Sequence, residues 1–200
     1  MHGFALVTAP SAPPIELELA KQHLRIDETS YDDLLELYIA AAVNYIDGRD
    51  GILGIALMTQ TWDLKLDSFP CDGVIELPLT PLQSVTSVTY TDTAGATQTW
   101  SAGNYQIDTA RRRPRIVPAY NATLPSLRGG SQINQVTVRA VYGYGDEPAS
   151  VPARIRAALL LHVTHLYERR EPVIVGNLNV NQIPMGYRDL LANAGLPAIA

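Results

Sequence analysis

The chain has 200 residues and a mass of 21.8 kDa, enough for one domain with an insertion or for two small domains. Hydrophobic residues make up 46% and charged residues 18%, which excludes a disordered polar chain and a collagen-like chain. The net charge of -5 argues against a dedicated duplex-DNA binder, because such a protein gains affinity from basic residues on phosphates. The densest apolar stretch, residues 157–166, is about half as long as the ~20 residues that a membrane-spanning helix needs, so we expect no membrane contact.

Two helices are predicted within the first 55 residues. Residues 15–26 follow a pair of prolines and carry Leu17, Ala20 and Leu24 at helical spacing. A longer apolar stripe begins after Ser30, which is expected to be its N-cap, and ends near residues 48–51. We expect these two helices to pack on each other.

Short runs rich in Thr, Val, Tyr and Trp follow from about residue 56, separated by Pro and Gly, and this pattern is typical of strands and turns. Residues 92–95 have the composition of a hairpin turn. The pattern predicts a small antiparallel β-sandwich or barrel, with strands at residues 61–66, 74–77, 84–90, 98–100, 105–107 and 136–142.

Helical periodicity returns after the Gly-rich break at residues 143–148. Pro152 is tolerated in a first turn, and Ile155, Leu159 and Leu166 recur on one face. The fold class predicted is therefore α+β: a bundle of two N-terminal helices and one long C-terminal helix (residues 1–55 and 148–200) with an inserted β-domain (residues 56–147). The tail from residue 172 is interpreted as an arm, with one or two helical turns at residues 187–194.

Residues that carry chemistry are few. Cys71 is the single cysteine and makes no internal disulfide, and motifs for phosphate loops, nucleophile elbows and zinc proteases are missing from the sequence. His162 and His165 stand three residues apart, whereas zinc-binding pairs on a helix usually stand four apart and need a third ligand. We expect no enzyme, no metal and no cofactor.

The sharpest local feature is a cluster of four arginines within five residues, on a loop predicted between strands. A solvated turn, a contact with an acidic partner surface and a contact with a DNA backbone would each explain it. Sequence-specific reading of DNA fits this loop less well, because no helix or aromatic platform accompanies the arginine cluster. We expect an assembly contact made by Arg111, Arg112, Arg113 and Arg115.

The order and spacing of several motifs together resemble the head-to-tail connector, or adaptor, proteins of tailed bacteriophages and gene transfer agents. The motifs span most of the chain: LELAKQHLRID (17–27), DDLL (32–35) leading to AAA (40–42), TQTWDL (59–64), PLTPLQSV (78–85), VPARIRAALLL (151–161) and LYERRE (166–171).

The resemblance implies a structural protein of the particle neck, made in the bacterial cytoplasm and assembled as a dodecameric ring under the portal. Its implied partners are the portal protein, a stopper or tail-completion protein, other copies of itself, and double-stranded DNA that passes through the channel without sequence-specific binding. In such proteins the C-terminal segment commonly reaches into the portal, which implies apolar anchors at Ile183, Met185, Tyr187, Leu190 and Leu191.

The charge distribution agrees with a ring. Residues 1–55 hold nine acids and three bases, whereas residues 151–200 hold three acids and five bases, so the two ends attract within one chain or between neighbours. An acidic channel wall would also let DNA pass without sticking. Two alternatives stay open: a tail-completion or neck protein on the tail side, and a small-molecule-binding or enzymatic β-domain with a helical cap.

Overall fold

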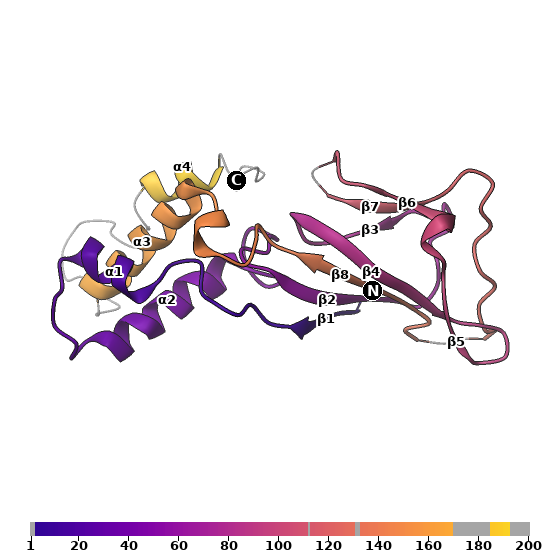
Figure 1. The fold of residues 1–200 in the computed structure, drawn as a ribbon, viewed down its shortest axis with the longest axis horizontal. Helices are drawn as coiled ribbons and strands as arrows, with labels where there is room; N and C mark the ends of the chain where they lie inside the picture. Colours follow the sequence, from indigo (N-terminus) through magenta and orange to yellow (C-terminus); the bar gives the residue numbers. More distant parts are fainter. Residues whose placement is uncertain (1–2, 112, 131–132, 170–184, 193–200) are drawn as a thin grey trace, which may run out of the picture.

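The protein is an elongated molecule with helices at one end and β-sheet at the other (Figure 1). The structure, a computed structural model, describes residues 3–111, 113–130, 133–169 and 185–192. The combination of helices with antiparallel β-sheets confirms the predicted α+β class. The helices within these ranges are α1 (Leu17–Leu24), α2 (Asp32–Ile46), α3 (Ala153–Glu168) and α4 (Met185–Ala192), with short 3-10 turns at Ala102–Asn104 and Pro148–Ser150.

The helices pack through one buried stripe on each long helix. In α3, the stripe follows from Ile155, Leu159 and Val163 at steps of four, and these side chains join the core with Ile39 and Ile46 of α2. Burying each such aliphatic side chain stabilises the fold by about 1.5–3 kcal/mol before conformational entropy is subtracted. The three predicted helices are therefore present and pack together as expected.

The junction between α1 and α2 is held by an ion pair rather than by a capping side chain. Lys21 donates to Asp32 at 2.7 Å, and this hydrogen bond raises the pKa of Lys21. The prediction that Ser30 caps α2 is wrong: Tyr31 is the residue before the helix, no side chain caps it, and the Ser30 hydroxyl donates to Glu28 at 3.2 Å.

The β-part has two antiparallel sheets that enclose a second core. One sheet has the strand order β1-β2-β8-β4-β5 and the other the order β3-β7-β6. Alternate residues of β8 point into the core, with Val136, Val138, Ala140 and Tyr142 all buried. The strands are β1 (Gly3–Thr8), β2 (Gln60–Leu66), β3 (Ile75–Glu76), β4 (Leu82–Thr91), β5 (Thr97–Thr99), β6 (Tyr105–Asp108), β7 (Arg115–Pro118) and β8 (Val136–Tyr142).

Two of these strands, β1 and β7, differ from the sequence prediction. β1 lies at the sheet edge, where it pairs with β2 and stacks Phe4 on Trp62 with the ring centroids 4.6 Å apart. The first strand therefore belongs to the sheet, although residues 1–55 are expected in the helical part. β7 pairs with β3 and β6. Neither strand has the regular alternation by which a strand is found in a sequence.

The turns that close the sheet follow from local chemistry. The predicted hairpin turn at residues 92–95 is present: Asp92 accepts hydrogen bonds from the backbone of Ala94 and Ala96 through Oδ1, both at 2.9 Å, and Gly95 has φ +89°. At the end of β8, Gly143 has φ +124°, and a Cβ there would overlap the backbone of Met58.

The two cores meet at a short junction. Leu57 and Met58 pack in the helical core, and the adjacent Ala56 packs in the sheet core. Asp47, directly after α2, accepts a hydrogen bond from the Leu57 backbone at 2.6 Å and two from the Gln60 side chain at 3.1 and 3.0 Å. The helical end is thus fixed to the first central strand of the sheet.

Candidate assembly surfaces

The arginine cluster lies at the hairpin between β6 and β7. Arg115 belongs to β7, whereas the other arginines lie in the connecting loop. Asp108 and Arg115 are opposite each other in the ladder, and Arg115 donates to the carboxylate at 2.9 Å. This hydrogen bond lowers the pKa of Asp108. The positive charge of Arg115 is therefore partly neutralised by a carboxylate of the same chain.

The other arginines of this loop are less constrained. Arg111 lies 3.8 Å from Asp108 and has 64% of its side chain exposed, and Arg113 is also exposed. Arg112 lies outside the described residues. Loosely held guanidinium groups at the surface are suited to a carboxylate or phosphate on a partner. The structure thus brings Arg111 and Arg115 to one carboxylate and leaves Arg111 and Arg113 accessible.

The predicted C-terminal arm includes a real helix, α4, that is docked on α3. Tyr187 and Leu191 are only 2% and 4% exposed, and Leu190 is half-buried against the same helical core. Met185 begins α4, and Ile183 lies outside the described residues. Two of the proposed portal anchors are therefore covered by the chain itself.

A histidine beneath α4 explains how the helix is held. The hydroxyl of Tyr187 lies 3.3 Å from Nδ1 of His162, a hydrogen bond whose direction depends on the histidine tautomer. The His162 ring also meets Tyr45 of α2 edge to face, at 5.2 Å between centroids. Burial, followed by the nearby His165, lowers the pKa of His162, and burial raises the pKa of Tyr187.

The His162 ring is buried and packs between Tyr45 and Tyr187. Among the described residues, no group of three or more His, Cys, Asp or Glu side chains is placed to hold a metal ion. In the same part of the chain, no helix has the length and apolarity needed to cross a bilayer. His162 thus has its place in the helix packing.

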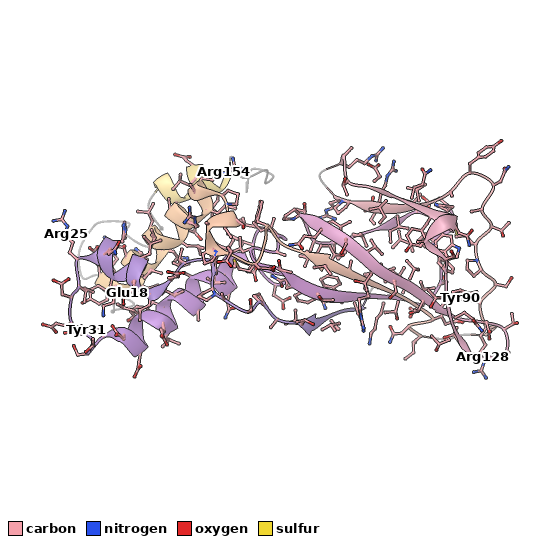
Figure 2. The ribbon with its side chains drawn as sticks, in the orientation of Figure 1. Glu18, Arg25, Tyr31, Tyr90, Arg128 and Arg154 are labelled. Atoms are coloured by element: carbon pink, nitrogen blue, oxygen red, sulfur yellow. The ribbon has the colours of Figure 1, made fainter. Side chains whose placement is uncertain are left out.

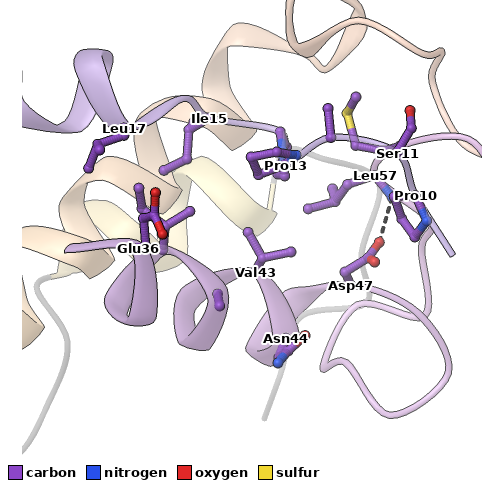
Figure 3. A pocket seen from close by; sticks show the side chains of 15 residues that line it. Pro10, Ser11, Pro13, Ile15, Leu17, Glu36, Val43, Asn44, Asp47 and Leu57 are labelled. Atoms are coloured by element: carbon purple, nitrogen blue, oxygen red, sulfur yellow. Dashed lines mark hydrogen bonds between the residues drawn. The ribbon is translucent and has the colours of Figure 1, made fainter. Parts of the chain in front are cut away.

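An apolar groove runs along α2, opposite the segment that links β1 to α1 (Figure 3). Its volume is about 520 Å³, and apolar side chains such as Ile39, Val43 and Met58 line much of it. Asp47 reaches its edge, but its carboxylate is already bonded to Leu57 and Gln60. Burial is the largest influence on this carboxyl and raises the pKa of Asp47. The groove offers a surface for apolar side chains rather than a set of converging polar groups.

The sequence prediction missed this groove. Its two walls come from residues 10–17 and from α2, which are brought together only because β1 joins the sheet and turns the chain back along the helix. The one available signal is the run of prolines and small residues at positions 9–14, which is compatible with an extended segment.

The fold is similar to that of chains in solved structures of gene transfer agent particles. One similar chain is from the neck of an empty gene transfer agent particle computed with six-fold symmetry, at a TM-score of 0.76 and 25% identity over 96% of this chain and 94% of that one. A second is from the virion of a native gene transfer agent particle, at a TM-score of 0.75 and 24% identity over 95% and 93%. A third is from the native neck computed with twelve-fold symmetry, at a TM-score of 0.64 and 22% identity over 94% and 93%.

The family model described as phage gp6-like head-tail connector protein matches residues 14–128, which is more than half of the chain. This protein belongs to that family, so it is a structural head-tail connector, as the sequence resemblance implies. No sequence among the curated proteins matches it significantly. The matched region contains α1, α2 and most of the β-part.

Proposed function

We propose that this protein forms a ring, of twelve copies, beneath the portal of a DNA-filled head and joins that head to the tail. The observation that carries the proposal is the family match combined with a fold that is shared, over nearly its whole length, with a subunit of a particle neck. The proposed partners are the portal protein on one side, a stopper or tail-completion protein on the other, and neighbouring copies of the chain. The proposed location is the particle neck, after synthesis in the host cytoplasm.

We assign the portal contact to the arm that contains Ile183, Met185, Tyr187, Leu190 and Leu191. Since Tyr187 and Leu191 are buried against α3, contact through them requires α4 to leave its docked position. The hydrogen bond between Tyr187 of α4 and His162 of α3 has the long distance of 3.3 Å. A helix of eight residues that packs on α3 through apolar side chains can exchange one apolar partner for another.

We assign the second partner contact to the arginine loop, through Arg111, Arg112, Arg113 and Arg115. In this role the loop binds an acidic protein surface, and DNA passes through the ring without specific contact because the chain as a whole is acidic. Changing all four arginines to Ser should reduce the yield of joined particles and their sensitivity to salt. An unchanged yield and salt dependence would remove the loop from the proposal.

The test of the function is electron microscopy of particles made with and without the gene for this chain. Loss of the chain should leave filled heads and finished tails unjoined, or heads that release their DNA. Intact joined particles would refute the proposal. Heads that keep their DNA while tails fail to mature would instead favour a tail-completion protein on the tail side.

A further inference from the structure

The helix α2 is apolar on the side that faces away from the core. Its inner stripe includes Ile39 and Ile46, which join the helical core, and Leu35, which is also buried. A helix at the surface of a monomer normally carries polar residues on its outer side. Here the outer residues are mostly apolar, and we refer to them as the α2 outer face: Leu37, Ala40, Ala41 and Asn44.

The exposure of this face is large. Leu37 is 63% exposed, and Ala40 and Ala41 beside it are exposed as well. The small side chains leave the helix backbone accessible to close approach by another element. The face therefore combines a projecting leucine with a flat strip beside it.

The groove along α2 continues this surface. Ala40 and Asn44 belong both to the α2 outer face and to the lining of the groove, which Val43 and Leu57 extend inward (Figure 3). A ridge with an adjoining groove of about 520 Å³ is a surface that can both insert a side chain and receive one. Contiguous apolar surface of this kind marks a protein contact.

The edge of the face is acidic. Asp33 and Glu36 are exposed on the first turns of α2, and neither forms an ion pair with another described side chain. On the other side of the helical part, α3 presents exposed Ala153, Arg154 and Ala157. Figure 2 shows Arg154 directed outward on the side of the helices away from α2. One side of the helical part is thus apolar with an acidic edge, and the opposite side offers small residues with a basic group.

We propose that the α2 outer face and its groove bind a second copy of this chain, on the side of α3 that carries Ala153, Arg154 and Ala157. A closed ring needs a contact between two different surfaces of neighbouring subunits, so that each copy uses one surface toward the left and another toward the right. The opposite placement of these two surfaces meets that requirement. The inference rests on the proposed ring, and it names the surfaces that close it.

The experiment is photo-crosslinking inside assembled particles that contain the full chain. The change Leu37→p-benzoylphenylalanine places the reactive group on the α2 outer face, and Thr93→p-benzoylphenylalanine is the control, on the exposed turn between β4 and β5 at the far end of the molecule (Figure 1). Irradiation of the first variant should give a product of twice the chain mass of 21.8 kDa, with its crosslink in a peptide that contains Arg154. The control should give at least ten-fold less of that product.

Three outcomes would overturn the interface. They are a crosslink from position 37 to a different protein, a particle-bound chain without any crosslink at that position, and a crosslink to a second copy that maps away from α3. If the unaltered chain is missing from purified necks, the proposed function fails, and the interface fails with it. Detection of the unaltered chain in the neck therefore separates the two failures.

A second pair of variants covers the case in which the photoreactive group disturbs assembly. Leu37→Glu should lower incorporation into particles at least ten-fold, whereas Leu37→Met should be incorporated normally. Both free proteins should melt within about 2 °C of the unaltered chain, because an exposed side chain contributes little to the fold. Normal incorporation of Leu37→Glu would overturn the proposal.

Discussion

Replacing Asp47 should loosen the connection between the helical end and the sheet. Its carboxylate accepts hydrogen bonds from the backbone of Leu57 at 2.6 Å and from the side chain of Gln60, and both donors belong to buried residues. Gln60 in turn accepts a hydrogen bond from the Trp62 indole at 2.8 Å. Asp47→Ala removes the acceptor at the base of this series and leaves the Leu57 N–H without a partner.

The expected loss follows from these bonds. A hydrogen bond to a charged group contributes about 1.5–3 kcal/mol, and a buried donor left unsatisfied costs about 1–3 kcal/mol. Burial opposes the ionised form, which is why the pKa of Asp47 is raised above 3.8, so the loss is smaller than the sum of these terms. We expect Asp47→Ala to reduce the free energy of unfolding by about 2–4 kcal/mol, which lowers the melting temperature by about 4–16 °C for a chain of this size.

Thermal unfolding followed by circular dichroism measures this difference, with Asp50→Ala as the control. Asp50 is fully exposed three residues away, so its loss should change stability by at most about 0.5 kcal/mol. Equal melting temperatures for the two variants would refute the role given to the Asp47 bonds.

A pH series of the same protein tests the raised pKa. A carboxyl group whose pKa is higher in the folded state than in the unfolded state contributes stability that is complete below pH 3.8 and declines as the pH rises through the folded pKa. The stability of the unaltered chain relative to Asp47→Asn should therefore fall as the pH rises through that window. A difference that stays constant across it would contradict the assignment.

Three further changes test other contacts. Because burial lowers the pKa of His162, stability should be lost as the pH falls from 6.5 through that lowered pKa; hydrogen exchange in α4, corrected for the intrinsic rate, should then increase, and His162→Gln should remove the increase. Gly143→Ala places a Cβ against the Met58 carbonyl at φ +124° and should cost about 1–3 kcal/mol in urea unfolding, and a cost near zero would contradict the close approach. Arg115→Gln should raise the pKa of Asp108 toward 3.8 when it is followed by NMR, and an unchanged value would show that Arg115 is not its cause.

The sequence allowed good prediction wherever the signal is local. The sequence predicts the helix α3 and the strand β8 because their buried residues recur at the spacing of one helical turn or at every second position, as at Ile155 and Leu159 or at Val136 and Val138. The turn at residues 92–95 was predicted for the same reason, since Asp92 and Gly95 act within four residues.

Contacts between segments that are distant in the sequence cannot be predicted from local spacing. β1 is a strand because the edge of β2 provides its hydrogen-bond partners. The four residues of β1 that follow Phe4 are all exposed, so the strand shows no alternation of buried and exposed residues. The pairing of Asp108 with Arg115 depends on the β6–β7 register, and the burial of Tyr187 depends on a contact with a residue 25 positions earlier. None of these partners is specified by the spacing along the chain.

Several polar groups that are buried or half-buried hold the fold together. Lys21 bonds to Asp32, Asp63 bonds to Arg139 through two hydrogen bonds of 2.8 Å, and Gln60 bonds to Asp47. The apolar outer side of α2 and part of the arginine loop are accessible. Because a connector acts by holding other proteins in place, an accessible apolar face on a rigid helix is of direct use to it, and it would be a solubility cost to a chain that worked alone.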